Sequence, residues 1–242
     1  MLGTDETSLD LNGWVTLNNN SGRAFNDAQL KLVAGELNRI QPDAPVARTQ
    51  ALAMEEDMAF GAAPPVEQRE LFEYQLYEIG RPVTVGNNET KQIEFVTASS
   101  VQATTFFVFD YSPTFGAYYS PIDYPEGYGT YFEGDVQTFL EFNTGEESGL
   151  GADLPAGRIR VYQEDVDGAG LLIGENRIDH TPEGEDIRFF LGNAFDLVGE
   201  RTQTNFEYIS NDVIQETFEI RLRNRKDDEI VEIRIPERLY RW

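Results

Sequence analysis

The 242-residue chain contains no cysteine and a single histidine, His180. The absence of cysteine excludes disulfides, thiolate metal ligands and cysteine nucleophiles. A single imidazole excludes, within one chain, the zinc sites of hydrolases that use two or more histidine ligands. Thiol chemistry and the common zinc-hydrolase sites are therefore removed as functions of this chain.

Positive charge is also scarce, and lysine occurs only at Lys31, Lys91 and Lys226. The 19 Lys and Arg residues face 43 Asp and Glu residues, which gives a net charge of -24. Phosphate groups and anionic lipid headgroups attract basic surfaces, so this composition argues against nucleic-acid and lipid-headgroup partners. An acidic, lysine-poor surface is typical of a salty habitat, but a GC-rich genome that favours arginine codons produces the same bias.

No apolar run approaches the roughly 20 residues that a membrane-spanning helix needs. The N-terminal sequence up to Trp14 lacks the basic and apolar regions of a signal peptide, although a fragment excised after its leader would look the same. A composition of 40% hydrophobic and 12% aromatic residues is typical of a folded globular chain. We therefore expect a folded protein without a membrane span.

Short runs of alternating apolar residues, separated by Gly, Pro, Asp and Asn, extend through most of the sequence and are clearest over residues 154–206. This pattern is typical of antiparallel strands joined by tight turns. About a dozen such runs, with no convincing long helix, predict an all-β chain. The loop lengths favour an immunoglobulin-like antiparallel β-sandwich, in one or two modules, over a closed barrel.

The runs fall into two series. We expect a first β-module over residues 1–111, interrupted at 41–68 by an Ala-, Pro- and acid-rich segment that is predicted to be a mobile excursion. A Tyr-rich loop over 112–134 then leads to a second β-module over 135–242, which could be truncated at its C-terminal end.

Two hairpins are predicted from turn-forming residues between alternating runs. Gly86-Asn87-Asn88 separates the runs at 82–85 and 91–98. Residues 224–229 separate the runs at 218–223 and 231–235, and this second pair is the clearer one because Arg and Glu could oppose each other on its solvent face.

The best candidate binding site is the Tyr-rich loop. Its proposed ligand-binding residues are Tyr118, Tyr119, Tyr124, Tyr128 and Tyr131. Tyrosines on a loop constrained by Gly and Pro offer contact area at low entropic cost, so they could stack on sugar rings or contact a protein. The alternative interpretation, which we weigh above binding, is that they cover the open end of a sandwich or fill the space between modules.

No catalytic residue, metal ligand or cofactor is predicted. His180 lies in Asp179-His180-Thr181-Pro182, where adjacent side chains point apart and no Gly-x-Ser-x-Gly nucleophile is present, so a role in a turn is favoured. Asp165-Val166-Asp167-Gly168 partly matches a calcium loop but lacks the distal glutamate. A two-carboxylate glycoside hydrolase stays open, because only the separation of two carboxylates in space identifies one.

Four groups of segments share their order and spacing with a known bacterial domain. They are LNGWVTL at 11–17 with AQLKLVAG at 28–35; YQLY at 74–77 with RPVTV at 81–85 and ETKQI at 89–93; LPAGRIRVY at 154–162; and GENRIDHTP at 174–182 with AFD at 194–196 and GER at 199–201. Together they resemble the C-terminal β-domain, a domain of unknown function, of the mucoidy-inhibitor A family. The resemblance spans most of the chain, and the RNRK at 223–226 also fits it.

The resemblance implies a β-sandwich in an exported or envelope-associated bacterial protein, and it offers no established catalytic residues. Members of the family usually carry coiled-coil helices ahead of this domain, which tends to continue past the part similar to residues 230–242, so we expect a fragment or a trimmed relative. Our hypothesis is a non-enzymatic structural or interaction domain at the bacterial cell envelope, with a protein or glycan partner. The alternative hypothesis is a carbohydrate-binding module that uses the Tyr-rich loop, with or without calcium.

Overall fold

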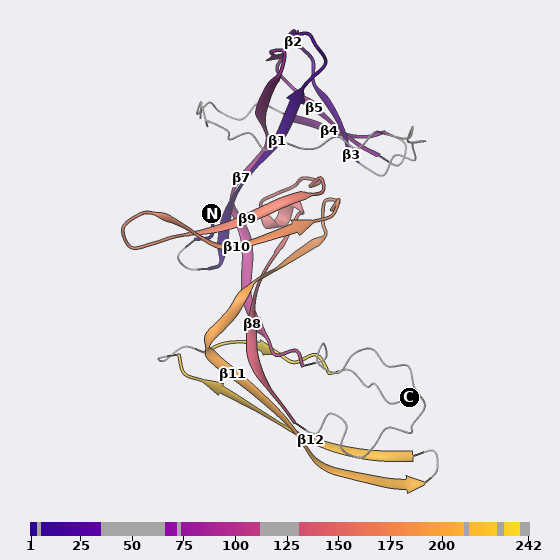
Figure 1. The fold of residues 1–242 in the computed structure, drawn as a ribbon, viewed down its shortest axis with the longest axis vertical. Coiled ribbons are helices and arrows are strands. Elements are labelled where there is room, and N and C mark those ends of the chain that lie inside the picture. The colour runs from indigo at the N-terminus through magenta and orange to yellow at the C-terminus, as the bar shows by residue number, and fades with distance from the viewer. Residues whose placement is uncertain are drawn as a thin grey trace.

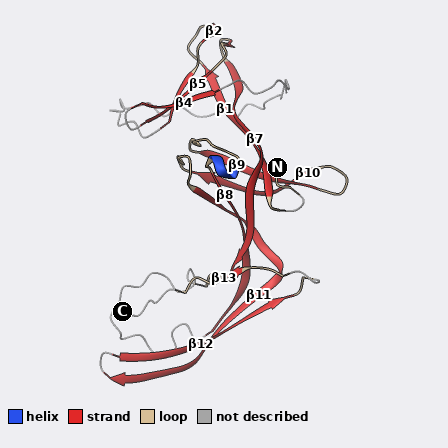
Figure 2. Cartoon of the chain, turned by 180° about the vertical axis from the view of Figure 1, so that it is seen from behind, coloured by secondary structure: helices blue, strands red, loops and turns tan. Residues whose placement is uncertain are grey.

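The computed structural model describes residues 1–3, 6–34, 66–71, 74–111, 131–210, 213–226 and 230–237. These residues form thirteen β-strands and one short 3-10 helix, with no α-helix among them, and all but one strand pairing is antiparallel (Figure 2). The elements are β1 Ser8–Asn19, β2 Phe25–Ala28, β3 Lys31–Ala34, β4 Val66–Leu71, β5 Tyr74–Ile79, β6 Val83–Val85, β7 Glu89–Val108, β8 Tyr131–Asn143, η1 Glu146–Ser148, β9 Gly157–Glu164, β10 Gly170–Ile178, β11 Asp186–Ser210, β12 Val213–Asn224 and β13 Ile233–Arg234. The predicted all-β antiparallel class is confirmed.

One long sheet, in the order β1-β7-β8-β11-β12, forms the axis of an elongated molecule (Figure 1). Its strands β7 and β11 contain 20 and 25 residues. Three smaller sheets flank it: β9 with β10, β2 with β6, and β3 with β5 and β4. The division into modules at 112–134 stays a prediction, but β7 and β8, which lie on either side of it, pair directly in this sheet.

The length of β7 depends on a bulge where the sequence suggests a break. Ser99 and Ser100 face only Asp10 on β1, because the register passes from Leu9 opposite Val101 to Leu11 opposite Ala98. Ser100 has a φ of 58°, and its N–H donates a hydrogen bond of 2.9 Å to Asp10 Oδ1. A β-bulge of this kind bends a strand without ending it, so the run at 91–98 and the residues after the two serines form one strand.

A larger bulge lies within β11, which continues through it as one strand. On β8 the partner of Asn193 is Gln137 and that of Val198 is Asp135, so four residues of β11, 194–197, face a single residue of β8. This excursion buries Leu197 completely while leaving the side chain of Phe195 97% exposed. The bulge therefore changes the direction in which the side chains of β11 point, at the place where the strand passes from one core to the next.

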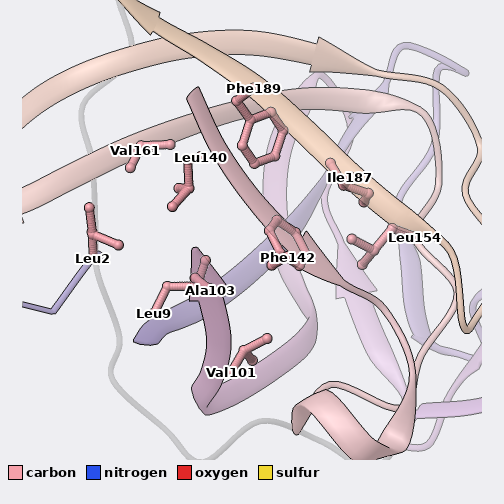
Figure 3. Close-up of a cluster of buried hydrophobic side chains, with 10 residues drawn as sticks. All are labelled: Leu2, Leu9, Val101, Ala103, Leu140, Phe142, Leu154, Val161, Ile187 and Phe189. Carbon is pink, nitrogen blue, oxygen red and sulfur yellow. The ribbon is translucent and has the colours of Figure 1, made fainter. Parts of the chain in front are cut away.

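The central core lies between the long sheet and the β9–β10 hairpin, as in a two-layer sandwich. Figure 3 shows its side chains pointing toward one another from both layers. The buried residues are Leu2, Leu9, Val101, Ala103, Leu140, Phe142, Leu154, Val161, Ile187 and Phe189. The turns at 154–157 and 179–186 are joined to each other, because Leu154 and Thr181 exchange backbone hydrogen bonds of 2.8 and 2.9 Å. Together these turns hold the outer layer against the sheet.

Two further cores lie along the same sheet. One contains Phe107, Phe109, Tyr111, Val136 and Leu197, and the segment 230–237 packs on it through Val231, Ile233 and Ile235. The other lies among the small sheets beside β1 and β7 and contains Ile79, Val83, Val85 and Ile93. The buried apolar residues thus form a series of small cores along one sheet, and not a single hydrophobic core.

Both predicted hairpins are wrong in their pairing. β12 pairs with β11, and β13 pairs in parallel with β7, so residues 218–223 and 231–235 are not partners. The Gly86-Asn87-Asn88 turn forms, with Asn88 at a φ of 57°, but β6 pairs with β2 and β7 pairs with β1. Turn residues reverse the chain, whereas the choice of partner depends on long-range packing that the turn does not determine.

The segment expected to be a mobile excursion also needs correction at one end. Residues 66–68 belong to β4, which pairs antiparallel with β5. Residues 41–65 lie outside the described part of the chain.

The ring of Phe109 packs closely against Gly199 on β11, and this contact gives a test of the packing. A Cβ added at Gly199 would overlap the ring of Phe109, whereas one added at Gly157 on β9 would find its nearest atom 3.8 Å away. We expect Gly199→Ala to lower the free energy of unfolding by about 1–3 kcal/mol through overpacking. Gly157→Ala is the matched control, and urea titration of both variants checks the difference. Equal stability of the two variants would contradict the packing described here.

Candidate functional site

Of the tyrosines proposed as a binding site, only Tyr131 lies in the described part of the chain. Tyr118, Tyr119, Tyr124 and Tyr128 lie outside it. Tyr131 begins β8 opposite Thr202, and its side chain is 56% exposed. Its hydroxyl donates a hydrogen bond of 3.0 Å to Glu133, and this bond raises the pKa of the tyrosine. The ring is thus presented to solvent at the sheet surface.

His180 lies in the turn between β10 and β11. Its Nδ1 accepts a hydrogen bond of 3.1 Å from the backbone N–H of Ala156. Thr181 beside it pairs with Leu154. These contacts tie the turn to residues 154–156 and give the imidazole a structural role, in agreement with the turn interpretation.

The Asp165-Val166-Asp167-Gly168 segment is a tight turn between β9 and β10. Asp165 Oδ1 accepts from Val166 N at 2.8 Å, and Asp167 Oδ1 accepts from Ala169 N at 2.9 Å. Gly168 has a φ of 83°, which favours glycine. The two carboxylates therefore stabilise the turn itself, and within the described ranges no group of three or more Asp, Glu or His side chains could hold a metal ion.

A cleft of about 230 Å³ lies where the central core gives way to the core under residues 230–237. On β7, Thr105 separates Ala103 of the first core from Phe107 of the second. On β8, Thr138 separates Leu140 from Val136 in the same way. Thr105 Oγ1 is buried and has no hydrogen-bond partner among the described residues, so this polar position interrupts the apolar face at some cost in stability.

The chemistry available in the cleft is limited. Its described lining consists of Leu2, Glu6, Thr105, Thr138, Gln163, Ile173, Leu191, Gly192 and Asn193. Glu6 is the only ionisable side chain in that set, so these residues offer no acid–base pair. The lining is mixed, with apolar groups beside hydroxyl and amide groups and one carboxylate.

A buried cation is the most unusual side chain in the described structure. Arg201 on β11 is fully buried, and its guanidinium lies 4.3 Å from the ring centre of Tyr111 and 3.5 Å from that of Phe218. Arg201 Nη2 donates to Glu237 at 2.9 Å, and the Tyr111 hydroxyl donates to the same carboxylate. Burial, together with the bond to Glu237, raises the pKa of Tyr111. The cluster joins the segment 230–237 to the sheet.

Three of the exposed apolar side chains lie close together in sequence and pairing at the free end of the β11–β12 hairpin, which we call the hairpin end and define as residues 206–210 and 213–215. Tyr208, Ile209 and Val213 are 59%, 58% and 47% exposed. Figure 1 places this hairpin at the far end of the molecule from β2. Sequence reasoning missed this site, although a signal was present. Consecutive apolar residues at 208–209 and 213–214 put apolar side chains on more than one face, which a strand with one buried face does not need.

The Arg201 cluster predicts how stability depends on its counter-ion. Glu237→Ala removes a carboxylate from a buried guanidinium, and we expect a loss of about 2 kcal/mol in the free energy of unfolding. This value lies below that for fully buried pairs because the Glu237 side chain is 37% exposed and partly screened. The double variant Glu237→Ala/Arg201→Met should recover part of that loss, because no charge is then buried. A double variant less stable than Glu237→Ala in chemical denaturation would contradict this explanation.

Neither a protein-family model, nor a curated protein, nor a solved structure matches this chain. Within the described residues, no helix has the length and apolar character needed to cross a membrane. The resemblance to the mucoidy-inhibitor A domain therefore depends on the sequence segments given above.

Proposed function

We propose that the chain is a non-enzymatic interaction domain of a bacterial cell-envelope or exported protein, and that it contacts a protein partner through the hairpin end. The observation that carries this proposal is the exposure of Tyr208, Ile209 and Val213 together at the end of a projecting hairpin. Exposed apolar groups that gather in one place cost solubility unless they serve as a contact surface. The envelope location is inferred from the family resemblance alone.

Strand pairing and a ring contact hold the side chains of the hairpin end in place. β11 and β12 pair along the hairpin from Leu197 opposite Asn224 to Ser210 opposite Val213. The rings of Phe206 and Tyr208 meet edge to face with centroids 5.0 Å apart. A paired strand presents its aromatic groups with little loss of entropy on binding, which favours recognition of a partner.

Charge around the hairpin end indicates the kind of partner. Glu207 and Glu216 flank the apolar residues, and no Lys or Arg occurs between Arg201 and Arg221. A partner with an apolar centre and basic groups around it would be complementary, and basic rim residues would increase the association rate. The binding residues are then Tyr208 and Ile209 at the centre, with the glutamates at the rim.

Site-specific photo-crosslinking in the native host tests this proposal. We expect a crosslinking amino acid at Tyr208 to capture one distinct protein, whereas the same group at Tyr162 on β9, 37% exposed, captures none. Ile209→Asp should abolish capture without lowering the melting temperature, because the side chain is already exposed. Equal capture from both positions, or capture unaffected by Ile209→Asp, would contradict the assignment of the hairpin end.

A second candidate function, carbohydrate binding through the Tyr-rich loop, is supported by the exposure of Tyr131 where that loop meets β8. Its test is retention of the protein on immobilised polysaccharides or a glycan array. Sugar stacking predicts that Tyr131→Ala together with Tyr118→Ala weakens retention at least about tenfold, since each stacked ring contributes on the order of 1 kcal/mol. Tyr162→Ala serves as control. A melting temperature unchanged by chelator would remove calcium from this function, and retention unaffected by the double substitution would reject it.

A further inference from the structure

β12 ends the long sheet and lacks the usual protection of an edge strand. Its only strand partner in the described part of the chain is β11. Its twelve residues include neither Pro nor Gly, and the register shifts in its pairing with β11 give the extra residue to β11. An edge of this length, without proline or bulge and with no further strand on it in the described part of the chain, can pair with a further strand. Its charged residues are the remaining protection against such pairing, and their order along the strand indicates which partner strand fits.

The two faces of β12 have different chemistry. Toward the core under residues 230–237 lie Ile220, which packs on that core, and Phe218, which covers the Arg201 guanidinium. On the solvent face Glu219 and Arg221 form an ion pair of 3.0 Å, with 47% and 66% of their side chains exposed. Leu222 continues the apolar row and is 37% exposed. Ile220 therefore has residues of opposite charge next to it, Glu219 on one side and Arg221 on the other. Two positions away on either side lies an apolar residue, Phe218 or Leu222.

We infer that the chain forms a two-fold symmetric dimer in which β12 pairs antiparallel with β12 of a second copy around Ile220. In this register Glu219 of each copy faces Arg221 of the other on the solvent face. Phe218 of each copy faces Leu222 of the other on the apolar face. The interface is isologous, so every favourable pair occurs twice. The long sheets of the two copies then continue into one another.

The charges select this register over its neighbours. A shift by two residues in one direction places Glu219 opposite Glu219, and in the other direction places Arg221 opposite Arg221. Like charges directly opposite each other destabilise a strand pair. A shift by one residue brings the apolar face of one copy beside the solvent face of the other, which loses the Phe218–Leu222 contacts. A register centred on Arg221 still pairs Glu219 with Arg223, but it places Arg221 opposite Arg221. The register centred on Ile220 joins opposite charges and apolar groups with no like charges opposite each other.

A second copy is a suitable occupant because β12 is electrically balanced in an otherwise acidic chain. Its charged residues are Glu216, Glu219, Arg221 and Arg223, whereas the whole chain has a net charge of -24. Repulsion between the two copies is therefore long-range and screened by salt, while the strand contact itself is attractive. Association should accordingly strengthen as NaCl is raised through the physiological range. The hairpin end shares residues 213–215 with β12, but the pairing is centred on Ile220 and its test changes only Glu219 and Arg221, so this inference does not depend on the proposed function.

Charge reversal at two exposed positions tests the dimer. We expect the intact chain to dimerise with increasing concentration in sedimentation-velocity experiments. Glu219→Arg places arginines opposite Arg221 of the other copy, and Arg221→Glu places glutamates opposite Glu219, so each variant should be monomeric. The double variant Glu219→Arg/Arg221→Glu restores opposite charges and should dimerise again. An equimolar mixture of the two single variants should also form a heterodimer.

The mixture separates the interface from any effect within one chain. Both single variants lose their own Glu219–Arg221 ion pair, and mixing does not restore that pair. Melting curves verify that each variant is folded, which we expect because exposed ion pairs contribute little to stability. A chain that stays monomeric at all concentrations and salt levels would overturn the inference. A dimer that survives both single reversals, or a mixture that stays monomeric, would overturn it as well.

Discussion

Backbone pairing between β7, β8 and β11 is the constraint on which the rest of the structure depends. The pairing of β7 with β8 joins residues 103–108 to 137–142, and that of β8 with β11 extends from Asn143 opposite Asp186 to Tyr131 opposite Thr202. All three cores lie against strands of this one sheet. Each layer that covers a core is short, namely the β9–β10 hairpin, the segment 230–237 and the small sheets beside β1. The hydrogen-bonded sheet thus connects the three cores, none of which is large enough to hold the molecule together by itself.

The series of cores explains where the polar and functional features occur. Between the central core and the next, Thr105 and Thr138 interrupt the apolar face, and the cleft forms there because neither covering layer reaches across. Beyond the last core the sheet continues as the β11–β12 hairpin, on whose side chains no second layer packs among the described residues. Its exposed apolar groups and its open edge are both consequences of a sheet that is longer than its covering layers.

Local features of the fold were predictable from the sequence, and pairing was not. The alternation over 154–206 and the run at 218–223 predicted strands where β9, β10, β11 and β12 lie, because burial of one face repeats every second residue. The Ser99-Ser100 step resembled a strand end, since a bulge and a turn use similar residues. The partner of β13 could not be read locally, because it is chosen by the exposed edge of β7 more than a hundred residues earlier. Of the candidate site, Tyr131 lies on an exposed surface, and because the other four tyrosines lie outside the described residues, the role of the Tyr-rich loop stays a prediction. The hairpin end was not predicted, because its aromatic rings lie on strands and not on a loop.

The short parallel strand β13 has a consequence for the order in which the molecule is assembled. The N–H of Ala103 donates to Thr7, and those of Phe107 and Phe109 donate to Glu232 and Arg234, so β1 and the segment 230–237 share one edge of β7. During synthesis β1 can occupy its part of that edge early, but the remainder stays open until residues 230–237 leave the ribosome. The part of the Phe107, Phe109 and Tyr111 cluster on which Val231, Ile233 and Ile235 pack therefore lacks this cover while β8 to β12 are translated. Contacts so distant in sequence also slow folding, which makes this part of the cluster the point at which a nascent chain most needs a chaperone.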